Sequence, residues 1–334
     1  MAPGNRKNPR HALTSASEYY LVDFLADFPD DETCLQFLWR TRYSEDGTHA
    51  FCERCEAETV FKRYTAKQQR QDWTCTACGL HVHPTAGTIF HKSSTGLHLW
   101  FYAMYLMTST RCGISAKQLE RELGVTYKTA HRMFKLIRTQ LMTQDDEEPL
   151  SGEVEMDETF YGGKPRMSDK AKWAKDDTRT WAQSRKRWSD QKKTPVFGMI
   201  ERGDQGRVRA HVVPSVQGPT LMGHIQDTVK PATTVYTDDA RVYRKMLPLQ
   251  GFKHQAIDHS AQVYVSGNVH TQAIEGFWSQ LKRGISGVHH SVAPQYLQSY
   301  VDEYVWRFNH RFDHKTGRGM FFTMARKAAV TMKV

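Results

Sequence analysis

The clearest helical pattern in the chain runs through residues 270–285, HTQAIEGFWSQLKRGI. Four apolar residues recur there at spacings of four, three and four: Ile274, Trp278, Leu281 and Ile285. These spacings predict one buried stripe of an amphipathic helix. Thr271 is the expected N-cap. Glu275 and Lys282 are seven residues apart, so a carboxylate and an ammonium should lie beside the same stripe.

The pattern between residues 153 and 258 is typical of strands. Alternating or short apolar runs predict five strands, at 153–162, 194–202, 206–214, 233–239 and 251–258. A helical pattern at 218–230 separates the third strand from the fourth. Strands that alternate with helices favour a layered α/β domain. This order predicts a five-stranded mixed sheet flanked by helices on both faces, in a ribonuclease-H-like arrangement.

Residues 113–141, GISAKQLERELGVTYKTAHRMFKLIRTQL, predict two helices joined at Gly124. Ser115 and Gln118 are expected to form a capping box on the first helix. The second helix should direct six polar side chains outward: Tyr127, Lys128, His131, Arg132, Lys135 and Arg138. Such a face can enter a major groove, so the segment resembles a helix-turn-helix. An ordinary helical hairpin would show the same pattern.

Four of the six cysteines form two Cys-x-x-Cys pairs, Cys52 with Cys55 and Cys75 with Cys78, separated by nineteen residues. Four thiolates at this spacing suit a tetrahedral zinc ion and leave no position open for water, which predicts a structural zinc in a zinc ribbon. The alternatives are two coincidental pairs or a redox dithiol. Three nearby histidines could also replace a thiolate: His81, His83 and His91.

The composition favours a polyanionic partner. The 334 residues carry a formal net charge of +10 and a pI near 9.2, for which nucleic acid is the first candidate. The N-terminal residues lack an apolar leader, and the longest apolar run, residues 97–107, is about half the length of a membrane span. We therefore expect a cytoplasmic protein, associated with the nucleoid when bound to DNA, with no membrane partner.

An acidic linker with a proline, residues 143–152, places the main domain boundary near the middle of the chain. The expected organisation has six parts: an N-terminal helical segment (1–48, with two short helices separated at Pro29 and a cap at Asp30 or Asp31), the zinc ribbon (49–92), the helix-turn-helix region (95–142), the linker, the catalytic domain (153–315) and a C-terminal tail (316–334).

Three carboxylates converge in the predicted sheet. Asp157 lies on the first strand, Asp238 ends the fourth strand beside it, and Glu275 lies on a helix that packs across them. Unpaired carboxylates this close repel one another, which implies bound cations, and oxygen ligands suit Mg²⁺ or Mn²⁺. Glu158 and Asp239 adjoin two of these residues, but neighbours on a strand point to opposite faces, so only one of each pair can join the site.

Several blocks of sequence are similar to a known family: MDETFYGGK, KTPVFGMIER, VYTDD, IEGFWSQLKRGI and FNHR. The chain resembles the DDE transposases of bacterial insertion sequences, and more narrowly the insertion sequence 1595 family, over about residues 18–315. The resemblance implies a catalytic triad of Asp157, Asp238 and Glu275 that holds two Mg²⁺ or Mn²⁺ ions. It also implies that Lys282 contacts the DNA end, and we expect the adjacent Arg283 to bind DNA as well.

The implied activity is DNA transposition. The ribbon and the helix-turn-helix would bind the terminal inverted repeats, and the triad would catalyse strand cleavage and then strand transfer. Double-stranded DNA is then the partner, with no small-molecule substrate. Pairing two element ends implies a homo-oligomer on DNA.

The chain departs from the family pattern by a basic insertion at 164–193, which contains Trp173, Trp181 and Trp188. Basic residues mixed with aromatic residues could grip DNA, and a solvated insertion fits equally well. Two other functions remain open at this stage. One is a transposase-derived DNA-binding regulator without strand-transfer activity, and the other is a hydrolytic nuclease of the same fold.

Overall fold

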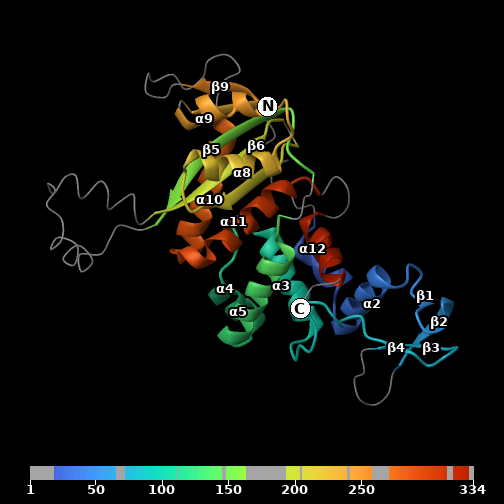
Figure 1. The fold of residues 1–334 in the computed structure, drawn as a ribbon. Helices are drawn as coiled ribbons and strands as arrows, with labels where there is room; N and C mark the ends of the chain where they lie inside the picture. The colour runs from blue at the N-terminus through green and yellow to red at the C-terminus, as the bar shows by residue number, and fades with distance from the viewer. Residues whose placement is uncertain are drawn as a thin grey trace, which may run out of the picture. The chain divides into compact units, whose positions relative to one another are not determined.

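The computed structural model describes residues 19–64, 72–110, 112–144, 148–162, 193–203, 205–238, 241–257, 271–313 and 319–330. The chain forms two compact units (Figure 1). The first unit comprises Met1–Met142 together with His310–Val334, and the second comprises Thr143–Asn309. Among the described residues, no helix is long and apolar enough to cross a membrane.

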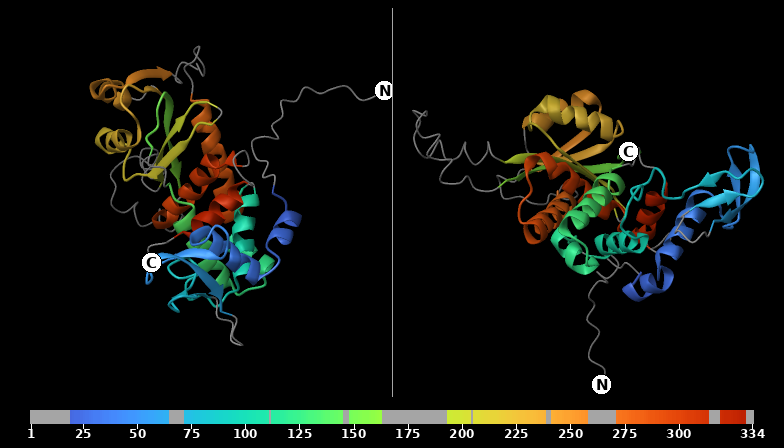
Figure 2. Two further views of the ribbon diagram at one scale, coloured as in Figure 1. Left: turned by 90° about the vertical axis from the view of Figure 1, so that its right-hand side faces the viewer. Right: turned by 90° about the horizontal axis from the view of Figure 1, so that it is seen from below.

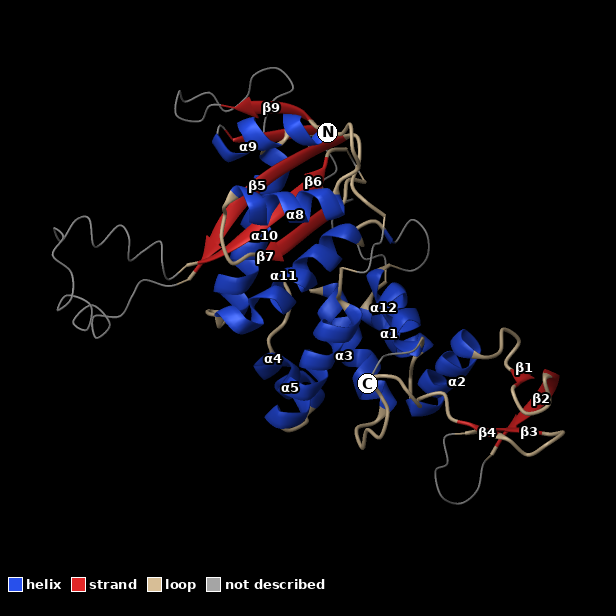
Figure 3. Cartoon of the chain, in the orientation of Figure 1, coloured by secondary structure: helices blue, strands red, loops and turns tan. Residues whose placement is uncertain are grey.

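A five-stranded sheet organises the second unit. Its strands are β5 (Glu153–Tyr161), β6 (Thr194–Glu201), β7 (Val208–Val212), β8 (Thr234–Asp238) and β9 (Lys253–Ile257). They lie in the order β7-β6-β5-β8-β9, with β5 antiparallel to β6 and parallel to β8 (Figure 3). The predicted five-stranded mixed sheet is therefore confirmed, and β5 lies at its centre.

Helices cover both faces of this sheet. Two helices, α8 (Gly218–Thr228) and α9 (Arg241–Met246), pack on one face, and the short η3 (Pro248–Gln250) follows α9. The other face carries α10 (Gln272–Gly284), which continues as the π-helical turn η5 (Ile285–His289), and α11 (Pro294–Asn309). Figure 2 shows the sheet between these two helical layers.

The apolar pattern of the strands explains the two layers. Alternate residues of β5 and β6 enter the core beneath α8 and α9, for example Met156 and Met199. The intervening residues face α10 and α11, whose buried stripe includes Ile274, Trp278 and Leu281. The amphipathic helix predicted around Glu275 is confirmed, because the four residues of its predicted stripe are all buried.

The first unit is helical, with a small four-stranded sheet. Its helices are α1 (Leu21–Asp27), α2 (Asp31–Arg42), α3 (Leu97–Ser109), α4 (Ala116–Leu123), α5 (Tyr127–Leu136), η2 (Ile137–Leu141) and α12 (Met320–Ala329). The sheet consists of β1 (His49–Cys52), β2 (Ala57–Arg63), β3 (Trp73–Cys75) and β4 (His81–Val82). The Asp30 side chain caps α2 by accepting the Thr33 N–H at 2.8 Å, as predicted.

Helix α12 was not predicted, since it lies in the segment interpreted as a tail. Its aromatic residues are buried among those of the N-terminal helices. The Phe321 ring stacks on the Tyr19 ring at 5.3 Å and meets the Phe24 ring edge-on at 5.6 Å. Residues from the two ends of the chain thus share one aromatic core.

Candidate active site and metal centre

Two carboxylates meet where the central strands run side by side. Strand β5 pairs with β8 in parallel, with Glu155 opposite Tyr236. Continuing this register by two residues brings Asp157 level with Asp238, the last residue of β8. Glu275 lies in the first turn of α10, the helix that covers this face of the sheet.

The alternation of side chains decides which acidic neighbour faces α10. The Asp157 Oδ2 atom accepts a hydrogen bond at 3.0 Å from the indole Nε1–H of Trp278 on α10. Glu158 points to the opposite face, where it accepts a hydrogen bond from the Tyr243 hydroxyl on α9. Asp157 therefore shares a face with α10 and Glu158 does not, as the sequence predicted. Asp239 lies outside the described residues.

The electrostatics of this face fit a cation site. The pKa of Asp157 is raised to about 6, mainly by burial and to a smaller extent by the negative charges of Asp238 and Glu275, against hydrogen bonds from the Glu158 N–H and the Trp278 indole. On the opposite face of β5, the pKa of Glu158 is raised to about 7, mainly by burial and to a smaller extent by Asp157 and Asp238, against the Tyr243 hydrogen bond. A divalent cation would offset this repulsion.

The three predicted ligands are not gathered as a closed set. In the part of the chain that the structure describes, the cysteine cluster is the one group of three or more metal-ligating side chains within 4.8 Å of one another. Asp157 and Asp238 are partly buried, whereas Glu275 is exposed and accepts a hydrogen bond from the Thr271 hydroxyl at 3.1 Å. The structure thus brings the carboxylates to one face and leaves Glu275 at its open side.

The N-cap of α10 lies at the predicted residue, Thr271, without a capping side-chain hydrogen bond. The helix amides are instead bound by Glu155, a fully buried residue of β5 that the sequence analysis missed. Gly198 was missed as well. It lies opposite Asp157 on β6, and a Cβ atom there would come within 2.5 Å of the Trp278 ring.

The four predicted cysteines come together in the first unit. Their Sγ atoms all lie within 4.8 Å of one another, with Cys52 to Cys78 at 3.6 Å and Cys55 to Cys75 at 3.9 Å. Zn–S bonds of about 2.3 Å in a tetrahedron place sulfur atoms about 3.8 Å apart. The cluster can therefore hold a zinc ion. The His81 ring bonds instead with Thr74 at 2.9 Å.

The outward face predicted for α5 is largely present. Tyr127, Lys128, His131, Arg132 and Lys135 are all exposed. Arg138 was also expected to point outward, and this prediction is wrong, because Arg138 is 4 % exposed and its guanidinium lies over the Phe134 ring at 4.1 Å. The chain becomes π-helical at Ile137, which shifts the faces of the following residues relative to an α-helix.

The start of α4 has half of the predicted capping box. The Ser115 hydroxyl accepts the Gln118 N–H at 3.1 Å, and Gly124 ends the helix with a left-handed conformation, φ 63°. The Gln118 side chain donates to Glu122 rather than forming the reciprocal half of the box.

The two predicted DNA-binding residues of α10, Lys282 and Arg283, are exposed in its last turn. Residues 164–192 of the basic insertion, including its three tryptophans, lie outside the described residues.

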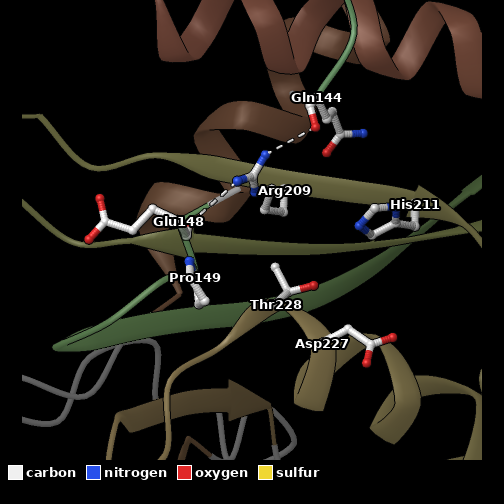
Figure 4. A pocket seen from close by; sticks show the side chains of 7 residues that line it. All are labelled: Gln144, Glu148, Pro149, Arg209, His211, Asp227 and Thr228. Atoms are coloured by element: carbon white, nitrogen blue, oxygen red, sulfur yellow. Dashed lines mark hydrogen bonds between the residues drawn. The ribbon is translucent and has the colours of Figure 1, made fainter. Parts of the chain in front are cut away.

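A cavity of about 180 Å³ lies between β7 and α8, away from these carboxylates (Figure 4). Seven residues line it: Gln144, Glu148, Pro149, Arg209, His211, Asp227 and Thr228. Arg209 is buried and donates to the backbone carbonyls of Gln144 and Glu148, so its charge holds the linker against the sheet. The cavity includes none of the predicted catalytic residues.

Known proteins identify the class. The family model described as the ISXO2-like transposase domain matches residues 149–309, which carry the sheet and all three carboxylates. An uncharacterized protein in transposable element ISH50 of Halobacterium salinarum is 31% identical over 260 residues, covering 75% of this chain and 82% of the relative. An uncharacterized transposase-like protein of Haemophilus influenzae is 34% identical over 97 residues, covering 29% of this chain and 76% of the relative. The chain belongs to the ISXO2-like transposase family of insertion sequences, which confirms the resemblance seen in the sequence.

Proposed function

We propose that this transposase binds the terminal inverted repeats of an insertion sequence and catalyses strand cleavage followed by strand transfer. The observation that carries the proposal is the placement of Asp157, Asp238 and Glu275 on one face of the sheet. The strand order β7-β6-β5-β8-β9, with β6 antiparallel to the central strand, supports a ribonuclease-H-like fold.

The same three carboxylates are the proposed ligands of two Mg²⁺ or Mn²⁺ ions. Their donor set fits, because carboxylate oxygens are the hard ligands that these ions prefer. When bound, such ions supply activation of the attacking oxygen and stabilisation of the leaving oxygen in phosphodiester chemistry. Trp278 holds Oδ2 of Asp157 and so fixes how that carboxylate is turned.

The first unit and the end of α10 supply the proposed DNA contacts. The exposed side chains of α5 present two lysines and an arginine from one helix, which supports a helix-turn-helix in which the first turn reads bases and the basic residues contact phosphates. The four cysteines are proposed to hold one structural zinc. Lys282 and Arg283 lie two turns beyond Glu275, so they would meet the backbone of the DNA end.

The test uses purified protein, Mg²⁺ and DNA from the flanks of the gene. We expect cleavage at a repeat end and joined products, both lost in Asp238→Asn. The matched control is Asp227→Asn, which changes an exposed aspartate of α8 on the other face of the sheet. Cleavage without joining would support a hydrolytic nuclease. Tight end-specific binding without cleavage, in Mg²⁺ and in Mn²⁺, would support a DNA-binding regulator.

A further inference from the structure

We propose that Glu155 is a positioning residue that fixes α10, and with it the carboxylate of Glu275, relative to Asp157. The proposal rests on the proposed function, because it assigns Glu155 a role in arranging the same carboxylates. Glu155 lies two residues before Asp157 on β5 and is fully buried. It touches no reacting group and acts through the helix.

Both oxygens of Glu155 have identified partners. Oε2 accepts the backbone N–H of Ala273 at 2.8 Å and that of Ile274 at 3.1 Å. Oε1 accepts Nε–H of Arg202 at 2.8 Å. One side chain therefore joins the central strand to the first turn of a helix that lies 118 residues further along the chain.

The physical need for this contact is clear. The first amides of a helix have no partner within the helix, and Thr271 supplies none through its side chain. A buried carboxylate is also costly unless it is paired and hydrogen-bonded. Glu155 supplies the acceptor that the α10 amides lack, and the positive end of α10 together with the Arg202 guanidinium compensates the buried carboxylate. The link between α10 and β5 is therefore rigid, because moving the helix would break the hydrogen bonds to Oε2 of the buried Glu155 carboxylate.

This contact sets the position of Glu275 directly. Glu275 directly follows Ile274, whose amide is bound by Glu155 of β5. The Cα of Glu275 is therefore one residue from a point at which α10 is fixed to β5. One turn later, Trp278 donates to Asp157 on the same strand. Two hydrogen-bonded points on β5 thus flank Glu275 along the helix, and they define its distance from Asp157.

The partners of Glu155 also exclude it as a metal ligand. Its charge is already offset by Arg202, whose guanidinium lies 3.6 Å from the centre of the Tyr236 ring and also reaches Glu153 at 3.5 Å. Asp157, two residues further along, is bound on this face by the uncharged Trp278 indole, and within the described ranges no lysine or arginine pairs with it. On this face of β5, Glu155 therefore has a structural role, and Asp157 is the proposed metal ligand.

The experiment compares Glu155→Gln with Glu153→Gln in the full-length protein. Glu153 is the matched control, because it is an exposed glutamate on the same face of β5 and also contacts Arg202. Three quantities are measured: amide hydrogen exchange of a peptide that contains Ala273 and Ile274, Mn²⁺ binding, and the Mg²⁺ dependence of cleavage. A Glu155→Asp variant, which keeps the charge, serves if the glutamine variant does not fold.

We expect Glu155→Gln to exchange the Ala273 and Ile274 amides faster and to bind Mn²⁺ about tenfold more weakly, the usual cost of losing a residue that supports a ligand. Cleavage should recover in part at saturating Mg²⁺, which a simple loss of stability would not produce. Glu153→Gln should match the wild type. The aspartate variant, one methylene shorter, should show the same changes to a smaller degree.

Two outcomes would overturn the inference. One is a Glu155 variant that is folded and less stable but has the wild-type Mn²⁺ affinity and Mg²⁺ dependence. The other is a wild-type protein that binds no Mn²⁺, since no ligand set would then exist to be positioned. Failure of the proposed function looks different: the wild type would bind Mn²⁺ and the glutamine variant would bind it more weakly, yet neither would cleave or join DNA. That result would leave the positioning role standing.

Discussion

Asp157 combines a partly buried carboxylate with two acidic neighbours, and this arrangement lowers the stability of the protein before any cation binds. Its pKa is raised to about 6 from an unfolded value of 3.8. An acid with a raised pKa binds more protons in the folded state, so between these values the stability of the protein falls as pH rises. This loss of stability is absent at pH values well below 3.8 and is complete at pH values well above about 6.

We therefore predict that Asp157→Asn stabilises the protein in the absence of Mg²⁺ and Mn²⁺. At pH 8 the gain should be about 1–3 kcal/mol, and it should disappear near pH 4. Thermal unfolding at both pH values measures it, with Asp227→Asn as the exposed control. A variant no more stable than the wild type at pH 8 would contradict the electrostatic account.

Gly198 gives a second prediction at the residue scale. A Cβ atom at this position would meet the Trp278 ring at 2.5 Å, so Gly198→Ala should destabilise the protein by about 1–3 kcal/mol and displace the indole from Asp157. Gly223→Ala is the control, because a Cβ atom there meets nothing within 4 Å. Urea unfolding followed by tryptophan fluorescence compares them. Equal effects of the two variants would show that Trp278 is not closely packed on β6.

At the element scale, what could be predicted from the sequence depends on how far each signal reaches. Periodicity predicted the strands and the stripe of α10, because each pattern is contained in one element. The Glu155 cap could not be predicted, since it joins residues 118 apart and a glutamate on a strand has no distinctive spacing. The outward direction predicted for Arg138 was wrong for a local reason, because the π-helical turn that begins at Ile137 shifts the directions of the side chains that follow. Helix α12 was missed because its apolar residues were read as part of a tail.

The cysteine cluster predicts how the small sheet responds to metal removal. The sheet has little core of its own, so binding energy from the metal should supply much of its stability. Chelation should speed hydrogen exchange in β1 to β4 and leave β5 and β6 protected. Cys75→Ser should mimic chelation, and Cys112→Ser should not, because Cys112 lies outside the cluster. Unchanged exchange in β1 to β4 after chelation would contradict a structural zinc.

Helix α5 makes the DNA-binding proposal quantitative. If Lys128 and Lys135 contact phosphates, replacing both with alanine should weaken binding and reduce the slope of log K against log salt by about 2. Lys230→Ala is the control, because Lys230 is exposed, belongs to the second compact unit and is paired there with Glu148. Fluorescence anisotropy over a range of salt concentrations gives the slopes. Equal slopes for the wild type and the double variant would favour an ordinary helical hairpin.

At the scale of the whole molecule, the chain passes between its compact units twice, at residues 142–143 and again at 309–310. The acidic linker signals the first passage, but no composition change signals the second. The net charge of +10 suits a protein that binds DNA over an extended surface. It says nothing about how many chains act together, and that number follows from the reaction instead.

Each chain carries one set of the three carboxylates, which supplies one proposed reaction centre. Two element ends must be cut and joined together, so we predict that at least two chains assemble on DNA carrying a terminal repeat. Light scattering should give a protein mass of at least twice 38.6 kDa in the complex that contains two duplexes. DNA without a repeat is the control and should not support that complex. Joined products from both ends in a complex with a single chain would contradict the prediction, because one reaction centre would then have served both ends in turn.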